Sequence, residues 1–109
     1  MRRGDIVTAV LPREHGKPRP ALIVQADDLL GSTTVLVCPL STGTEFRAPH
    51  RVQIEPTAQN GLRDISLIMT DKLQANLRDR CGSVIGRLDD RQMALVEARL
   101  AYILGIRLS

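Results

Sequence analysis

The sequence is poor in aromatic residues. Its 109 residues include one phenylalanine, Phe46, one tyrosine, Tyr102, and no tryptophan. Proteins that bind single-stranded nucleic acid by stacking bases on exposed rings need several such side chains, so this scarcity argues against those modules. A hydrophobic core must instead come from Val, Ile, Leu and Met, which fits an apolar content of 43%.

The chain also has little with which to bind a metal. Its two cysteines, Cys38 and Cys81, each lie in an apolar, strand-like run, and we expect them to be reduced and buried rather than joined in a disulfide. Neither they nor the two histidines, His15 and His50, show the spacing of zinc ligands. A metal-dependent nuclease needs several converging carboxylates, and the adjacent aspartate pairs suit a turn and a helix start better. We therefore expect no metal and no cofactor.

Long hydrophobic runs are absent. No apolar stretch approaches the roughly 20 residues of a membrane-spanning helix, and the start MRRGDIV does not resemble a signal peptide. A glycine-rich phosphate loop and the alternation of parallel strands with helices are also missing. The sequence predicts one soluble, cytoplasmic domain over residues 1–109, with no membrane association.

What the chain does have is a small excess of positive charge. The formal net charge is +3, and only Lys17 and Lys72 among its 15 basic residues are lysines. The planar guanidinium of arginine matches two phosphate oxygens at once, which is compatible with a polyanionic partner. The charge alone does not decide this, because many proteins without such a partner share it.

The hydrophobic pattern predicts several short strands followed by one helix. Asp89 and Gln92 have the spacing of a capping box, and Gly105 stands where a helix would end. A small antiparallel sheet or open barrel with the helix packed on it fits this order. Residues 74–80 could form a loop or one helical turn. The expected strands are 6–11, 21–25, 33–41, 51–55, 65–73 and 81–88.

One arginine stands at an unusual position. Arg19 lies between Pro18 and Pro20, where a predicted loop becomes an apolar strand. Proline restricts both its own backbone and that of the residue before it, so the conformation of Arg19 is limited on both sides. An arginine that only solvates the surface needs no such restraint, whereas one that binds phosphate or takes part in catalysis benefits from it.

The order and spacing of five motifs resemble those of the MazF/PemK family of toxin endoribonucleases. The motifs are RGDIV at the start, GKPRPALIV, VLVCPLST, GLRDISLIMTDKL, and GSVIGRLDD before the final helix. The resemblance implies a mainly β fold, a small SH3-like barrel of antiparallel strands with a C-terminal helix, acting as a homodimer. It also implies metal-independent cleavage of single-stranded RNA, often mRNA, and an acidic antitoxin protein as partner.

The family's catalytic positions fall on the junction between loop and strand at Arg19 and on the end of the expected strand 33–41. The resemblance implies Arg19 as the catalytic arginine and Ser41 as the catalytic hydroxyl, with Thr42 as the alternative, although threonine is usual there. Glu14 matches a glutamate that some members carry five residues before the arginine. Attack by the RNA's own 2′-hydroxyl would leave 2′,3′-cyclic phosphate and 5′-hydroxyl ends. Arginine suits charge stabilisation rather than proton transfer, which leaves Glu14 or His15 for the proton.

Two loops are expected to contact RNA. They span about residues 12–17 and 42–51, and their basic and polar side chains are predicted to bind the substrate and to attract an acidic antitoxin segment. The predicted RNA-binding residues are Arg13, His15, Lys17, Thr44, Arg47 and Arg51.

Two other functions remain alternatives. A gyrase poison of the CcdB kind shares the fold but depends on a tryptophan before a C-terminal Gly-Ile, and this chain has Gly105-Ile106 without any tryptophan. The serine at position 41 leaves open a small barrel that binds RNA or protein without cleaving it.

Overall fold

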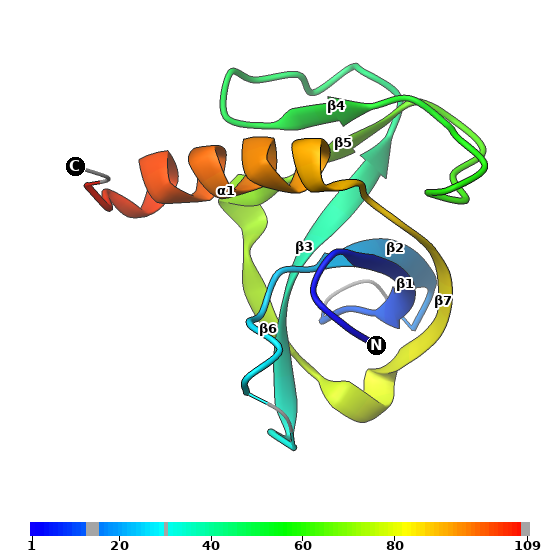
Figure 1. The fold of residues 1–109 in the computed structure, drawn as a ribbon. Helices are drawn as coiled ribbons and strands as arrows, with labels where there is room; N and C mark the ends of the chain where they lie inside the picture. The colour runs from blue at the N-terminus through cyan, green and yellow to red at the C-terminus, as the bar shows by residue number, and fades with distance from the viewer. Residues whose placement is uncertain (13–15, 30, 108–109) are drawn as a thin grey trace.

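The computed structural model describes residues 1–12, 16–29 and 31–107, and in this part of the chain the strands form one antiparallel sheet followed by one α-helix (Figure 1). The sheet order is β4-β5-β3-β2-β1-β7, and β6 pairs with β3 outside this path. The predicted fold class, mainly β with a C-terminal helix, is therefore confirmed. The strands are β1 (Asp5–Val10), β2 (Pro18–Ile23), β3 (Thr34–Thr42), β4 (Val52–Ile54), β5 (Ser66–Ile68), β6 (Gln74–Leu77) and β7 (Cys81–Arg87).

Strand β3 holds the two halves of the sheet together. Its first half pairs with β6 through Thr34–Val37 and with β2 through Val37–Pro39, while its last residues, Leu40–Thr42, pair with β5. In Figure 1 the long arrow of β3 accordingly runs from the curled strands β1, β2 and β7 to the smaller layer of β4 and β5. On the edge away from β2, the partner of β3 changes from β6 to β5 between Val37 and Leu40.

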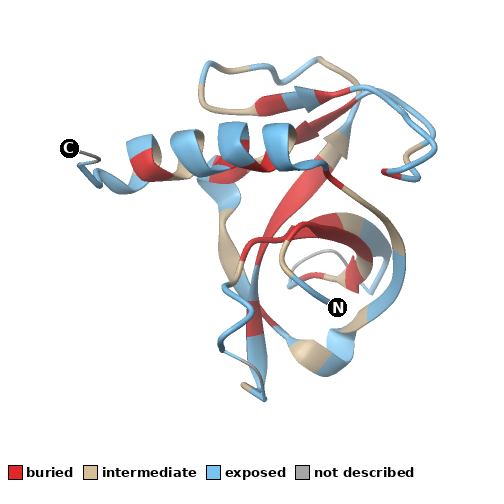
Figure 2. Cartoon of the chain, viewed as in Figure 1, coloured by how far each residue is buried: buried red, intermediate tan, exposed pale blue. Residues whose placement is uncertain are grey.

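The core lies on both faces of the inner strands. Residues 21–24 are all buried, as their apolar run predicts, and their side chains divide between two hydrophobic clusters. In β4, which falls within the expected strand 51–55, buried and exposed residues alternate: Val52 and Ile54 are buried while Gln53 is exposed. Figure 2 shows the buried positions concentrated along the strands and on one side of the helix.

Helix α1 (Asp90–Leu104) begins and ends where the sequence predicts. The backbone N–H of Gln92 donates to the Asp89 carboxylate at 2.7 Å, and the N–H of Asp89 donates to the Gln92 amide oxygen at 3.2 Å, which completes the capping box. Gly105 ends the helix with φ of 70°, a left-handed conformation that glycine adopts without strain. Met93 and Val96 pack into the core. No helix in the described residues is long and apolar enough to cross a membrane.

The segment between β5 and β7 differs from the prediction. Residues 65–73 do not form one long strand: β5 ends at Ile68, and a 3-10 turn, η1 (Thr70–Lys72), reverses the chain. Residues 74–80, for which a loop or helical turn was expected, form β6 and a second 3-10 turn, η2 (Arg78–Arg80). The polar sequence of β6 gives little sign of a strand, and its pairing with β3 decides its conformation.

Both cysteines are free thiols, as expected, although only one is fully buried. Cys38 is inaccessible, and burial, assisted by the negative charge of Asp71, raises the pKa of its thiol to about 12. Cys81 is half-buried, so the prediction that it is buried is wrong. It is the first residue of β7, immediately after η2, and it pairs with Ala9 at the end of that strand.

A turn at Asn60-Gly61 packs directly on β7. Asn60 is 1% exposed, and its side-chain oxygen accepts from the backbone N–H groups of Thr57 and Leu62, each at 3.0 Å. Gly61 has φ of 69°, and a Cβ there would lie 1.9 Å from the carbonyl oxygen of Ile85. The turn therefore requires glycine for its conformation and for its close approach to β7.

Candidate active site

A pocket opens where β2 begins and β3 ends, and we call it the β2–β3 pocket. It brings together three of the residues predicted to be catalytic, Arg19 from β2 and Ser41 and Thr42 from β3. Its volume is about 330 Å³. The rest of its described lining is apolar and consists of Leu11, Pro20, Pro39, Leu40 and Met69.

The pocket follows from the way in which β2 and β3 separate. Residues 18–20 pair with β1, and pairing between β2 and β3 begins only at Ala21, opposite Pro39. Beyond Pro39, strand β3 pairs with β5 on its opposite edge, and no pairing with β2 is described there. The two strands therefore diverge, and the side chains on either side of the divergence line the space between them.

The same divergence explains why prolines flank Arg19. A proline has no backbone N–H to donate, so within a sheet it is tolerated at an unpaired edge. Pro18 and Pro20 lie on the part of β2 that has β1 on one side and no described pairing to β3 on the other. Arg19 thus has a fixed backbone and an exposed side chain. This is the arrangement that the sequence suggested.

The two hydroxyls of the pocket have different surroundings. The Ser41 hydroxyl oxygen is buried and has no hydrogen-bond partner among the described residues, whereas Thr42 is exposed. A buried polar atom without a partner is unfavourable by about 1–3 kcal/mol and is rare in folded proteins. Rotation about the Cα–Cβ bond of Ser41 would let this hydroxyl donate to a group bound in the pocket.

The loop between β3 and β4 is fixed to η1 through Arg51. Its guanidinium donates from Nε and Nη2 to the two carboxylate oxygens of Asp71, at 2.9 and 3.0 Å, and from Nη1 to the carbonyl oxygen of Phe46 at 3.2 Å. The side chain of Arg51 is 12% exposed. Arg51 therefore has a structural role that its sequence position did not reveal, and contact with RNA stays a prediction for it.

Two further contacts tie the same loop to η1. The Thr70 hydroxyl donates to the carbonyl oxygen of His50, and the His50 Nε2 lies 3.6 Å from an Asp71 carboxylate oxygen. Hydrogen bonding to Arg51 holds the pKa of Asp71 below its ordinary value and raises the pKa of Arg51. Sequence inspection misses Asp71 because its partner Arg51 lies 20 positions earlier in the chain.

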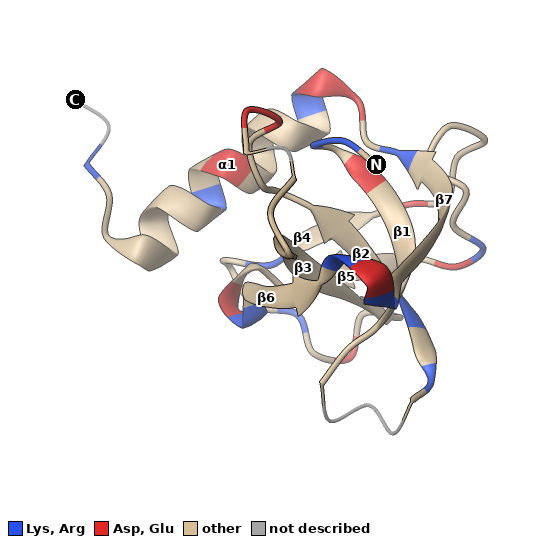
Figure 3. Cartoon of the chain, turned by 90° about the horizontal axis from the view of Figure 1, so that it is seen from below, with Lys and Arg blue, Asp and Glu red and all other residues tan. Residues whose placement is uncertain are grey.

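The remaining predicted RNA-binding residues lie outside the β2–β3 pocket or outside the described residues. Arg13, Glu14 and His15 belong to the segment that the structure does not describe. Lys17 is exposed next to β2, and Figure 3 shows a basic position in the described part of the segment that leads into β2. Of the β3–β4 loop residues, Arg47 is exposed and Thr44 is half-buried, and neither lines the pocket.

The described lining of the β2–β3 pocket offers one cation, Arg19, and two hydroxyls, those of Ser41 and Thr42. Such a set can stabilise negative charge that develops on a phosphate group. The described residues contain no group of three or more His, Cys, Asp or Glu side chains that could hold a metal ion.

Comparison with known proteins decides the family. The model of the PemK-like, MazF-like toxins of type II toxin–antitoxin systems matches residues 2–104. The chain belongs to this family. The predicted resemblance is thus confirmed, and the family assignment disfavours the gyrase-poison alternative.

Individual relatives agree with this assignment. A protein of Mycolicibacterium smegmatis named probable endoribonuclease MazF is 38% identical over 107 residues, which cover 97% of this chain and 98% of the relative. The Mycobacterium tuberculosis toxin MazF-mt6 superimposes with a TM-score of 0.81 at 25% identity, over 95% of this chain and 99% of that toxin. A mycobacterial endoribonuclease solved in complex with its cognate antitoxin shares the fold, with a TM-score of 0.82 at 21% identity, over 100% and 99% of the two chains.

We expect the Arg51–Asp71 pair to order the β3–β4 loop in a pH-dependent way. Because the pKa of Asp71 is lowered in the folded state, the stabilisation is present above the ordinary aspartate pKa of about 3.9 and is lost as the pH falls through the lower folded value. Asp71→Asn should therefore speed amide hydrogen exchange in residues 43–50 at neutral pH, with under about 1 kcal/mol lost from global stability because the pair is partly exposed.

Mass spectrometry of hydrogen exchange measures this effect. Asp79→Asn, which changes an exposed carboxylate on η2, is the matched control and should leave the loop unchanged. Equal exchange in residues 43–50 of Asp71→Asn and of the unmodified protein would show that the pair does not order the loop.

Proposed function

We propose that the protein is an endoribonuclease toxin that cleaves single-stranded RNA, mRNA included, at the β2–β3 pocket without a metal ion or other cofactor. The observation that carries the proposal is the meeting of Arg19 with the Ser41 and Thr42 hydroxyls in one pocket. The 38% identical relative named probable endoribonuclease MazF supports it. The proposed site of action is the cytoplasm, where such RNA is found.

The reaction needs no nucleophile from the protein. The 2′-hydroxyl oxygen of the RNA attacks the adjacent phosphorus, and the bond from phosphorus to the 5′-oxygen of the next nucleotide breaks. The 2′-hydroxyl loses a proton and the leaving 5′-oxygen gains one, so the products carry a 2′,3′-cyclic phosphate and a 5′-hydroxyl. The protein has to stabilise the extra negative charge of the pentacoordinate intermediate and to transfer the two protons.

Arg19 is suited to the first task. Its guanidinium can donate two parallel hydrogen bonds to two non-bridging phosphate oxygens. Because its backbone is fixed by β1 pairing and by Pro18 and Pro20, little reorganisation accompanies the reaction. Arginine stays protonated at neutral pH, so it acts through its charge and not as a base.

A hydroxyl of the pocket supplies a further donor. Ser41 is the stronger candidate for this donor, because its buried hydroxyl oxygen has no hydrogen-bond partner among the described residues. A bound phosphate oxygen would provide one. Thr42, which is exposed at the last position of β3, is the alternative. A serine at the usual threonine position keeps the hydroxyl and removes only a methyl group.

Proton transfer is assigned to the loop before β2. Glu14 is the candidate base and His15 the second candidate, because a carboxylate or imidazole can exchange a proton near neutral pH. The loop starts at Pro12, directly after Leu11, which lines the β2–β3 pocket. We also assign RNA contacts to the two loops beside the pocket, through Arg13, His15, Lys17, Thr44, Arg47 and Arg51.

The catalytic assignment predicts a graded loss of cleavage. Arg19→Ala should abolish it, and Arg19→Lys should be badly impaired because an ammonium group cannot form the bidentate contact. Ser41→Ala should lose about tenfold to a thousandfold, the scale of one lost oxyanion donor. The measurement is the rate of cleavage of single-stranded RNA in EDTA, with Arg91→Ala, an exposed arginine on α1, as the control that cleaves normally.

Each alternative has a distinct result in the same assay. Cleavage by Arg19→Ala at the normal rate would contradict the proposed mechanism, as would loss of all activity in EDTA. RNA binding without cleavage by the unmodified protein would instead favour the non-catalytic barrel.

We propose that the protein acts as a homodimer. Helix α1 and the residues after it expose large apolar side chains, among them Tyr102, which is 77% exposed, with Leu95, Leu104 and Ile106. A second copy would cover such a surface, and a twofold interface leaves a groove between protomers that suits a strand of RNA. Sedimentation at micromolar concentration should give a dimer, and a monomer would contradict the proposal.

We also propose an acidic antitoxin as partner. The basic positions at Lys17 and Arg19 would attract an acidic segment that folds on binding and blocks the β2–β3 pocket. Relatives that share the fold have been solved with an antitoxin bound. Expression of the unmodified protein without an antitoxin should arrest growth, and expression of Arg19→Ala should not. Normal growth of cells that contain a high level of the unmodified protein would contradict the toxin assignment.

A further inference from the structure

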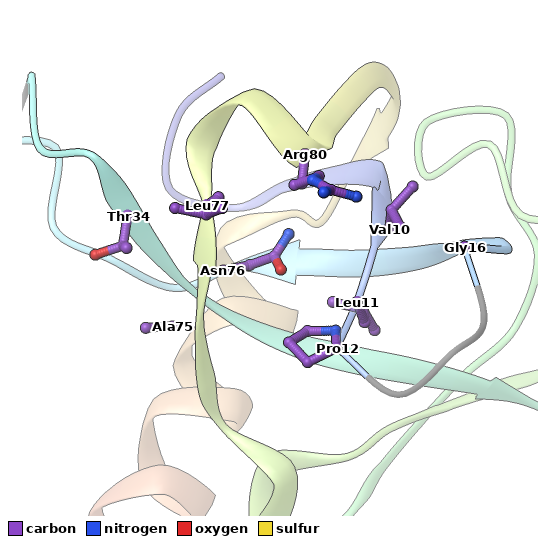
Figure 4. Close-up of a pocket in the computed structure, with 9 residues that line it drawn as sticks. All are labelled: Val10, Leu11, Pro12, Gly16, Thr34, Ala75, Asn76, Leu77 and Arg80. Atoms are coloured by element: carbon purple, nitrogen blue, oxygen red, sulfur yellow. The ribbon is translucent and has the colours of Figure 1, made fainter.

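A second hollow lies beside β6, at the other end of β1 from the N-terminus, and we call it the β6 pocket (Figure 4). Its volume is about 570 Å³. Val10, Leu11 and Pro12 form one side, and Asn76, Leu77 and Arg80 form the other, with Gly16, Thr34 and Ala75 completing the lining. It combines apolar walls with one amide and one guanidinium.

The amide belongs to a buried side chain. Asn76 is 4% exposed, and its Nδ2 donates to Cys81 Sγ at 3.7 Å, a contact with a weak acceptor that uses one of the two amide donors. The side-chain oxygen offers two further acceptor positions. In Figure 4 the Asn76 amide and the Arg80 guanidinium both extend from their backbone toward β1, which carries Val10.

The β6 pocket is continuous with the β2–β3 pocket. A third hollow, of about 610 Å³, lies between them and shares Leu11, Pro12 and Ala75 with the β6 pocket, and Leu11, Pro39 and Met69 with the β2–β3 pocket. An RNA strand with one phosphate bound at Arg19 can therefore follow a single track to Asn76.

The charges along this track are of one sign. Arg19 lies at one end, Lys72 lines the middle, and Arg80 lies at the far end, while no aspartate or glutamate is present among the described lining residues of the three hollows. Cations spaced along a groove follow the phosphates of a single strand. Between them, an apolar pocket with one amide suits an uncharged nucleobase, because an amide can donate to and accept from a base edge at once.

We propose that the β6 pocket is a subsite for one unpaired nucleobase of the RNA, recognised by the Asn76 amide, with Arg80 on an adjoining phosphate. The proposal rests on the proposed function and adds to it the residue that selects the sequence at one position. The base lies between the apolar side chains of Leu11 and Leu77, and its edge faces Asn76. Asn76 and Arg80 act in binding and selection and take no part in the bond-breaking step.

Asn76→Leu, of similar volume and without hydrogen-bonding groups, tests the recognition. On a pool of random single-stranded RNAs, sequencing of the cleaved ends should show that base preference falls about tenfold or more at one position and is unchanged at the others. Thr34→Val is the matched control, because the Thr34 hydroxyl at the rim of the same pocket points away from Asn76 in Figure 4. Unchanged preference at every position in Asn76→Leu would overturn the proposal.

Arg80→Gln, at an exposed position of η2, supplies a second test that does not depend on a buried side chain. With RNAs shortened one nucleotide at a time, it should raise KM several-fold for RNAs long enough to reach the β6 pocket and leave shorter ones unchanged. An equal effect on long and short RNAs, or none on either, would overturn the subsite. The subsite would also be overturned if Arg80→Gln weakened only the binding of an acidic peptide and left the cleavage of RNA unchanged.

These outcomes are separable from failure of the proposed function. If the unmodified protein does not cleave RNA, the proposed function fails. If it cleaves, and either Asn76→Leu leaves the base preference unchanged or Arg80→Gln does not raise KM for the long RNAs alone, only the subsite fails.

Discussion

Strand β3 pairs with β2 only as far as Pro39, and the candidate site depends on where this pairing ends. Up to Pro39 it pairs with β2, and from Leu40 to Thr42 it pairs with β5. The sheet order places β3 between these two strands, so they lie on opposite edges, and beyond Pro39 the edge that faced β2 has no described partner. The space that opens is lined by whatever side chains stand there, and in this chain those include a guanidinium and two hydroxyls.

The rest of the fold fixes that geometry. The buried residues 21–24 anchor β2 just after Arg19, and the pairing of residues 18–20 with β1 fixes the backbone at Arg19 itself. On the other side, β5 ends in η1, from which Asp71 holds Arg51 and the loop that follows Thr42. A pocket built from strand ends that are fixed on both sides places its charged and polar groups before a substrate arrives, which is the condition for electrostatic catalysis.

The sequence predicted the parts of the structure that local chemistry determines. The capping box of α1, the glycine at its end and the constrained backbone at Arg19 between two prolines follow from neighbouring residues. Features that arise from contacts between distant segments were missed. Strand β6 has a polar sequence and is specified by its pairing with β3, and the Arg51–Asp71 pair joins residues 20 positions apart. The Ser41 hydroxyl is buried without a hydrogen-bond partner among the described residues, and this too is visible only in the packed structure.

The central claim is that the substrate's own 2′-hydroxyl is the nucleophile and that the protein supplies charge and proton transfer. It is tested most directly with an RNA that the protein cleaves, resynthesised with a single 2′-deoxy nucleotide on the 5′ side of the cut. The account predicts that this RNA still competes for binding but is not cut at that bond, while the all-ribose RNA yields a 2′,3′-cyclic phosphate. Cleavage of the deoxy-substituted bond at the normal rate would contradict it.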